Sequence, residues 1–138
     1  MKMESTMKIK KILILEDEEI ILDLLSKKLA EQGYEVKTAR NGKEGMFMME
    51  KEIPDLVLTD VVMPEKNGFD VISEMKQNEL LKNVPIIIIS NSGQPVEIDK
   101  AKELGVSDWV IKTEFDPQEI IQKVNKVLTR AIHPPEAD

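Results

Sequence analysis

Short aliphatic runs alternate with longer amphipathic runs along the whole chain. The short runs have the length and composition of β-strands, and they lie at residues 11–15, 34–39, 56–59, 84–89 and 108–111. Apolar residues at helical spacing predict helices at residues 19–32, 41–52, 69–77, 97–104 and 116–131. The run at 84–89 is the most continuously aliphatic, which favours a strand covered on both faces.

Turn and cap residues separate these segments. Gly33 stands where the first helix is expected to end, and Asn41 is placed to cap the next one, which Pro54 terminates. Residues 116–119 read Asp-Pro-Gln-Glu, which predicts a capping residue, a proline at the first helical position and a capping-box acid. The residue chemistry therefore supports the same boundaries as the apolar pattern.

Five strand–helix pairs in strict alternation predict an α/β fold, a doubly wound parallel sheet with helices on both faces. The 138 residues suit one domain, since domains run to roughly 100–200 residues. No repeat, low-complexity stretch or linker interrupts the alternation. We expect one domain over residues 10–131, with short tails at 1–9 and 132–138 and no output domain.

Composition excludes several kinds of chemistry. The chain has no cysteine, which removes disulfides, thiol nucleophiles and zinc–cysteine sites. With 19 basic and 26 acidic residues the formal charge is −7, which argues against direct binding of nucleic acid. The apolar runs are too short for a signal peptide or a membrane helix, so we expect a cytoplasmic protein without a membrane partner.

Polar residues terminate four of the five predicted strands. In a doubly wound sheet, ligands bind beyond the carboxyl ends of the strands, so these residues are expected to meet at one edge. They are Glu16 and Asp17 after the first strand, Asp60 after the third, Ser90 after the fourth and Lys112 after the fifth.

Three neighbouring carboxylates repel one another and raise a pKa unless a cation lies among them. Mg²⁺ fits best, because it accepts carboxylates and completes its shell with water and phosphate oxygens. Lys112 adds a positive charge for an anion, so the implied ligand is a phosphoryl group. The chain has no P-loop, dinucleotide or nucleophile-elbow motif, so a carboxylate that forms an acyl phosphate is the most consistent nucleophile, and Asp60 is the best candidate.

Four motifs resemble the receiver domain of two-component response regulators. They are ILILEDE at residues 12–18, DLVLTDVVMPEKNG at 55–68, PIIIIS at 85–90 and GVSDWVIK at 105–112. The resemblance covers nearly everything from residue 10 to residue 128. It implies a flavodoxin-like sheet of strand order 2-1-3-4-5.

The resemblance also implies roles for individual residues. Asp60 would accept the phosphoryl group, Asp17 would bind Mg²⁺ directly, and Glu16 would act on the ion through water. The backbone carbonyl of Val62 would complete the protein ligands. Ser90 would be the switch hydroxyl, Trp109 the switch aromatic residue and Lys112 the lysine that contacts the phosphate.

Partners follow from the same resemblance. A sensor histidine kinase or a histidine phosphotransfer protein would donate the phosphoryl group, and the output would be contact with a downstream protein. The exposed side of the first helix, at Ile20, Ile21 and Leu24, can form part of a docking surface for a phosphotransfer partner, although packing at the edge of the domain explains it equally well. Such a protein is not an enzyme beyond its own Mg²⁺-dependent phosphorylation and dephosphorylation.

The sequence departs from the family pattern at four positions. Glu16 replaces the usual aspartate, and Asn91 replaces the small residue that usually follows the switch hydroxyl. Thr113 stands where a cis-proline is usual, and Trp109 is larger than the usual tyrosine or phenylalanine. None of the four removes a reactive group.

Two alternatives remain. Because Asn91 and Thr113 depart from the family pattern, the sequence is also consistent with a receiver-like interaction module that is not phosphorylated. A magnesium-dependent phosphatase is less consistent, because it would need a second acid where Val62 stands. The acids at the start of the first helix, Glu18, Glu19 and Asp23, are interpreted as a solvated helix start favoured by the helix dipole rather than as metal ligands.

Overall fold

Strands and helices alternate strictly in the computed structural model, which describes residues 9–91, 94–112 and 116–132. In chain order these elements are β1 (Lys11–Leu15), α2 (Glu19–Glu31), β2 (Glu35–Ala39), α3 (Gly42–Lys51), β3 (Leu56–Asp60), α4 (Gly68–Lys76), β4 (Ile86–Ser90), α5 (Pro95–Glu103), β5 (Asp108–Ile111) and α6 (Pro117–Ile132).

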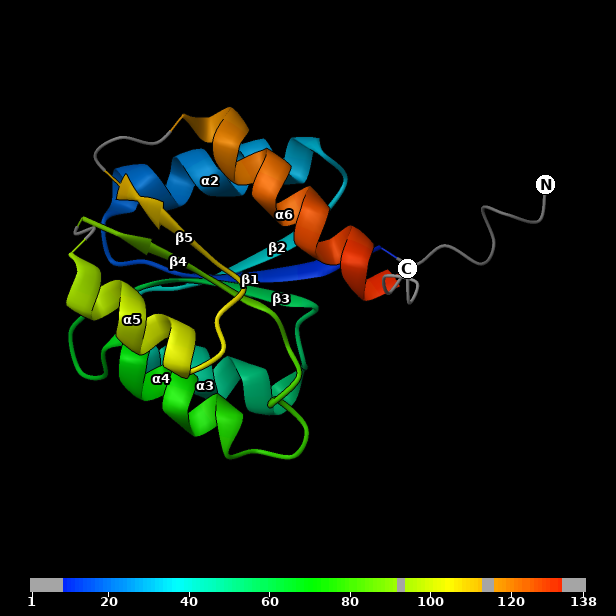
Figure 1. The fold of residues 1–138 in the computed structure, drawn as a ribbon. Helices are drawn as coiled ribbons and strands as arrows, with labels where there is room; N and C mark the ends of the chain where they lie inside the picture. The colour runs from blue at the N-terminus through cyan, green and yellow to red at the C-terminus, as the bar shows by residue number, and fades with distance from the viewer. Residues whose placement is uncertain (1–8, 92–93, 113–115, 133–138) are drawn as a thin grey trace, which may run out of the picture.

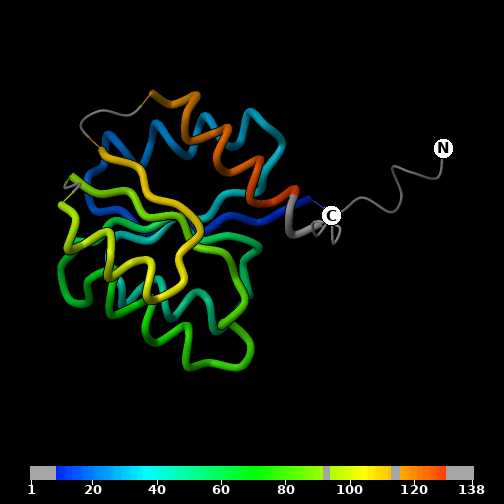
Figure 2. The backbone as a smooth tube through the Cα atoms, in the orientation of Figure 1, coloured from blue at the N-terminus to red at the C-terminus, as the bar shows by residue number. Residues whose placement is uncertain are grey.

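The strands form one five-stranded sheet of order β2-β1-β3-β4-β5, and all neighbouring strands are parallel. Helices α2 and α6 cover one face of the sheet, and α3, α4 and α5 cover the other (Figure 1). The backbone trace crosses from one side of the sheet to the other as the chain proceeds (Figure 2). This arrangement confirms the predicted doubly wound fold and its strand order.

The core is divided into two layers by the sheet. Alternate residues of β1 point to opposite faces, so Leu13 and Leu15 pack with α3 and α4, while Ile12 and Ile14 pack with α2 and α6. Every residue of β3 and of β4 is buried, as expected for central strands of a parallel sheet. The site-bearing ends of these two strands therefore project from strands that are buried along their whole length.

The predicted caps are present. The Asn41 side chain accepts a hydrogen bond from the Glu44 N–H at 2.7 Å, and Asp116 Oδ1 accepts one from the Gln118 N–H at 3.0 Å. Gly33 has a φ of +98°, the left-handed conformation that ends a helix and favours glycine.

Two predicted boundaries were wrong for reasons that involve proline. α5 begins at Pro95, two residues before the expected start, because a proline without an N–H suits the first helical position. β4 begins at Ile86 rather than at residue 84, and Pro85 contributes only its carbonyl, which accepts from the Val57 N–H at 3.0 Å. The other boundaries differ from the predicted ones by at most one residue.

Within the described ranges, no helix is both long enough and apolar enough to cross a membrane.

Candidate functional site

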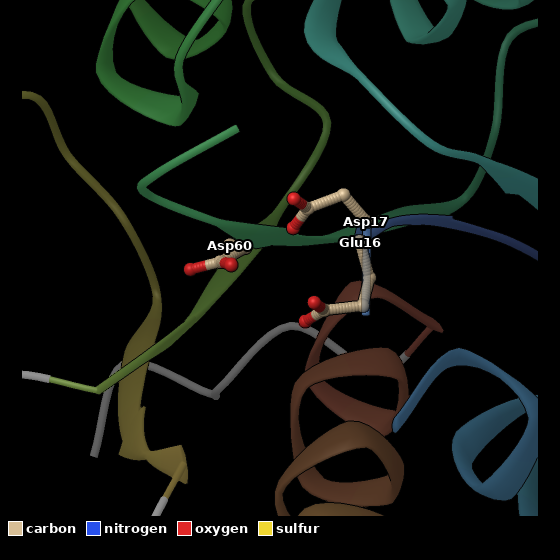
Figure 3. A group of neighbouring side chains, drawn as sticks. All are labelled: Glu16, Asp17 and Asp60. Carbon is tan, nitrogen blue, oxygen red and sulfur yellow. The ribbon is translucent and has the colours of Figure 1, made fainter. Parts of the chain in front are cut away.

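Three carboxylates converge at the carboxyl edge of the sheet. Glu16 and Asp17 follow β1, and Asp60 is the last residue of its neighbour β3 (Figure 3). Each residue offers a carboxylate oxygen such that the three oxygens lie within 4.8 Å of one another. Glu16 and Asp60 are buried, whereas Asp17 is exposed. The structure thus brings the three predicted acids together.

Lys112, the residue after β5, lies among carboxylates. Its Nζ is 2.9 Å from Asp60 Oδ2, 3.0 Å from Glu16 Oε2 and 3.1 Å from Glu18 Oε1. The lysine side chain is only 3% exposed, so these contacts form in a low-dielectric setting where charge pairing is strong. An intramolecular ammonium therefore supplies part of the counter-charge that the acids require.

Asp60 is held through both of its carboxylate oxygens. Oδ2 accepts from Lys112, while Oδ1 accepts from the Val61 N–H at 2.7 Å and from the Val62 N–H at 3.4 Å. Two successive backbone N–H groups aimed at one oxygen form a small anion-binding concavity. These hydrogen bonds fix the orientation of the Asp60 carboxylate.

The two carboxylate oxygens of Glu16 differ in their hydrogen bonds. Oε2 accepts from Lys112 and from the Glu18 N–H at 2.9 Å, whereas Oε1 is buried and has no hydrogen-bond partner among the described residues. A buried carboxylate oxygen normally has a partner, so this atom favours a ligand such as a cation or its water. The donor set, three carboxylates with oxygen ligands only, fits Mg²⁺.

Burial is the main influence on the pKa values of Glu16 and Asp60. Burial raises the pKa of Asp60 and the pKa of Glu16 above their ordinary values, and the hydrogen bonds from Lys112 offset only part of that rise. Repulsion from Asp60 also raises the pKa of Glu16, as the sequence predicts, but it contributes less than burial does. Burial alone would lower the pKa of Lys112, but its bonds to Asp60 and Glu16 raise that pKa above the ordinary value.

The loop after Asp60 is fixed by the start of α4. The Gly68 N–H donates to the Val61 carbonyl at 2.7 Å, and a Cβ at residue 68 would lie 2.2 Å from the Asp60 carbonyl oxygen. Asn67 caps the helix by accepting from the Asp70 N–H at 2.9 Å. A glycine is therefore required where the helix meets the strand end that carries Asp60.

Ser90 lies at the same edge of the sheet, whereas Trp109 lies within β5 and not at its carboxyl end. Ser90, the last residue of β4, is 3% exposed, and Trp109 on β5 is half-buried and pairs in register with Ile88. Trp109 borders a shallow pocket with Ile98 of α5 and Glu119 of α6. Asn91 is exposed, and the predicted departure at Thr113 lies outside the described residues.

The sequence model for the response regulator receiver domain matches residues 12–125. The chain belongs to this family.

Other receivers and response regulators resemble the chain closely. The response regulator SaeR of Staphylococcus aureus is 35% identical over 119 residues, which are 86% of this chain and 50% of SaeR. The chain thus spans about half the length of the curated relatives it matches.

Solved structures agree with this assignment. The chemotaxis response regulator CheY4 of Vibrio cholerae has a TM-score of 0.81 and 28% identity, with 87% of this chain and 99% of that chain covered. The phosphorylated cyanobacterial phytochrome response regulator RcpA has a TM-score of 0.76 and 28% identity, with 94% of this chain and 98% of that chain covered.

One receiver residue near the site was missed by sequence reasoning. Glu18 was interpreted as part of a solvated helix start, but its carboxylate contacts Lys112 at 3.1 Å while its side chain remains 51% exposed. The signal that could have found it is its position two residues after Glu16, since both acids follow the strand next to the one that ends in Asp60.

Magnesium is expected to stabilise this receiver. A ligand that binds only the folded state at about 100 times its Kd adds about 2.7 kcal/mol to the free energy of unfolding. Urea unfolding with and without Mg²⁺ measures the gain, which Asp17→Asn should largely remove. The gain should shrink from pH 7 towards pH 5, because the raised pKa values of Glu16 and Asp60 let protons compete with the ion. An equal gain in Asp17→Asn contradicts the assignment of the ion to these carboxylates.

Proposed function

We propose that this receiver domain, over residues 10–131, is a phosphorylation switch of a two-component system. A sensor histidine kinase or a histidine phosphotransfer protein donates a phosphoryl group to Asp60, and the phosphorylated domain acts through contacts with a downstream protein. The observation that carries the proposal is the buried Asp60–Lys112 contact of 2.9 Å inside the acidic cluster of a receiver fold.

The chain supplies a nucleophile and charge stabilisation. An Asp60 carboxylate oxygen attacks phosphorus, the phosphorus–nitrogen bond of the phosphohistidine breaks, and the imidazole nitrogen keeps the electron pair and takes up a proton. Phosphoryl transfer needs mainly positioning and electrostatic stabilisation, which the Lys112 ammonium and the Val61 and Val62 amides provide at the acceptor. Attack of water on the acyl phosphate returns the carboxylate and inorganic phosphate.

Glu16, Asp17, Asp60 and the Val62 carbonyl would hold Mg²⁺. When bound, the ion supplies neutralisation of the negative charge on the phosphoryl oxygens. Ser90 would then donate its hydroxyl to the phosphoryl group, and Trp109 would follow the movement of β4 into the space that opens. The half-buried position of Trp109 between α5 and α6 supports this role, because a change there reaches two helices at once.

The phosphodonor would dock on an apolar rim beside the acids. Ile20 at the start of α2 is 82% exposed, Val62 after β3 is 76% exposed and Val96 at the start of α5 is 71% exposed. Ile21 and Leu24, the other two predicted docking residues, are half-buried, so Ile20 is the best-placed of the three. Exposed apolar side chains around a polar centre suit contact with another protein.

The test is phosphorylation of the whole chain by acetyl phosphate with Mg²⁺. We expect the mass of one phosphoryl group on the intact protein and a change in Trp109 fluorescence, and we expect Asp60→Asn to abolish both. Beryllofluoride, a phosphoryl mimic, should give the same fluorescence change in the wild type. A wild type that gains no mass and does not respond to beryllofluoride overturns the proposal and favours an interaction module that is not phosphorylated.

A further inference from the structure

Lys112 Nζ donates hydrogen bonds to Asp60 and Glu16 and forms an ion pair with Glu18. An ammonium group carries three N–H bonds and no acceptor. Three carboxylate oxygens lie within hydrogen-bond distance of Nζ, at 2.9 Å for Asp60, 3.0 Å for Glu16 and 3.1 Å for Glu18. A phosphoryl oxygen that binds Lys112 must therefore compete with these three carboxylates for the ammonium.

The three partners differ in how easily they can leave. Glu16 is fully buried and its Oε2 also accepts from the Glu18 N–H, so releasing it would leave a buried charge with fewer partners. Asp60 is 7% exposed at its side chain and is the acceptor itself. Glu18 is 51% exposed, so its carboxylate can turn into water at small cost.

We propose that Glu18 is a positioning residue that pairs with the Lys112 ammonium in the unphosphorylated domain and competes with the phosphoryl group for it. This inference rests on the proposed function. The Glu18 carboxylate weakens binding of the phosphoryl group in two ways, because it holds the ammonium away from the incoming oxygens and because it repels their negative charge. Glu18 therefore influences how readily Asp60 is phosphorylated, although it does not itself bind the phosphoryl group.

A matched control is available on the next residue. Glu19 carries the same charge, is 65% exposed at its side chain and also lies in the first turn of α2, but its carboxylate pairs with Arg40 at 3.5 Å. Glu18→Gln and Glu19→Gln remove one negative charge each at nearly the same place. Only the first removes a negative charge that pairs with Lys112.

The experiment measures the Kd of beryllofluoride by Trp109 fluorescence in saturating Mg²⁺, and the rate of phosphorylation by acetyl phosphate. For Glu18→Gln we expect about three- to fivefold tighter beryllofluoride binding and faster phosphorylation, which corresponds to about 0.6–1 kcal/mol, the upper part of the range for a partly exposed ion pair. Glu19→Gln should stay within about twofold of the wild type, which corresponds to less than about 0.5 kcal/mol.

Two further measurements separate positioning from a structural role. The Kd of Mg²⁺ alone and the urea midpoint should be nearly the same in Glu18→Gln and in Glu19→Gln. Unchanged or weaker beryllofluoride binding in Glu18→Gln, or an equal gain in Glu19→Gln, overturns the inference while the proposed function stands. A wild type that neither binds beryllofluoride nor becomes phosphorylated at Asp60 overturns both.

Discussion

Replacing Lys112 with methionine is expected to lower the free energy of unfolding at pH 7 by about 3–5 kcal/mol, the cost of removing one partner from a buried ion pair. The methionine keeps the volume of the lysine stem but leaves Glu16 and Asp60 buried without their counter-charge. Urea unfolding monitored by circular dichroism measures the loss. Phosphorylation by acetyl phosphate should slow by about 10²–10³, as when one preorganised donor is removed from a transition state.

The pH dependence of this variant gives a second check. Burial already raises the pKa values of Glu16 and Asp60, and loss of Lys112 raises them further. A carboxyl with a raised folded pKa costs stability above that pKa and costs nothing once the pH lies below its unfolded value. The deficit of Lys112→Met should therefore shrink between pH 7 and pH 4.

The control for Lys112 is a second lysine with a carboxylate partner at the same distance. Lys123 of α6 contacts Asp108 at 2.9 Å, but its side chain is 26% exposed. Lys123→Met should cost less than about 1 kcal/mol, because solvent screens the pair. If both variants lose equally little, burial of the Lys112 charge is not what stabilises the site.

Gly68→Ala is expected to cost about 3 kcal/mol in the free energy of unfolding, at the upper end for an overpacked position. Its Cβ would meet three backbone atoms, the Asp60 carbonyl oxygen at 2.2 Å, the Val61 Cα at 3.0 Å and the Asp60 carbonyl carbon at 3.1 Å. Backbone at the end of a fully buried strand cannot move aside as a flexible side chain can. The loop that places the Val61 and Val62 amides against Asp60 must shift instead, so phosphorylation should fall as well.

Asn67→Ala tests whether the effect comes only from a weaker helix start. It removes the cap of α4 and should cost about 1 kcal/mol, with phosphorylation retained. Chemical unfolding and the acetyl phosphate assay of the two variants, side by side, give the comparison. If Gly68→Ala loses no more stability than Asn67→Ala, the close approach of helix and strand does not constrain the site.

The fold could be predicted because each strand and helix carries its own signal. The aliphatic runs that became β3 and β4 are buried at every position, and Gly33 and Asn41 terminate and start helices as their chemistry indicates. The boundaries of the strands and helices were harder to predict, because a proline can either end an aliphatic run or begin a helix. Pro95 begins α5, whereas Pro85 stands just before β4.

The gathering of acids was predictable from topology, but the contacts of Lys112 were not. Parallel strands place their ends together, so residues after β1 and β3 had to be neighbours. Which acid an ammonium reaches depends on side-chain length and burial, and these are set only when all strands are packed. For the same reason the sequence indicated repulsion as the cause of the raised pKa values, where burial is the larger cause.

The Lys112 contacts join parts of the chain that are far apart in sequence, 96 residues to Glu16 and 52 residues to Asp60. The acids therefore leave the ribosome long before the amine that neutralises them. A nascent chain carries the chemical groups of the site early, but it acquires the assembled site only after its fifth strand has emerged. A chain that can be phosphorylated has therefore completed the synthesis of β5 and assembled the whole sheet.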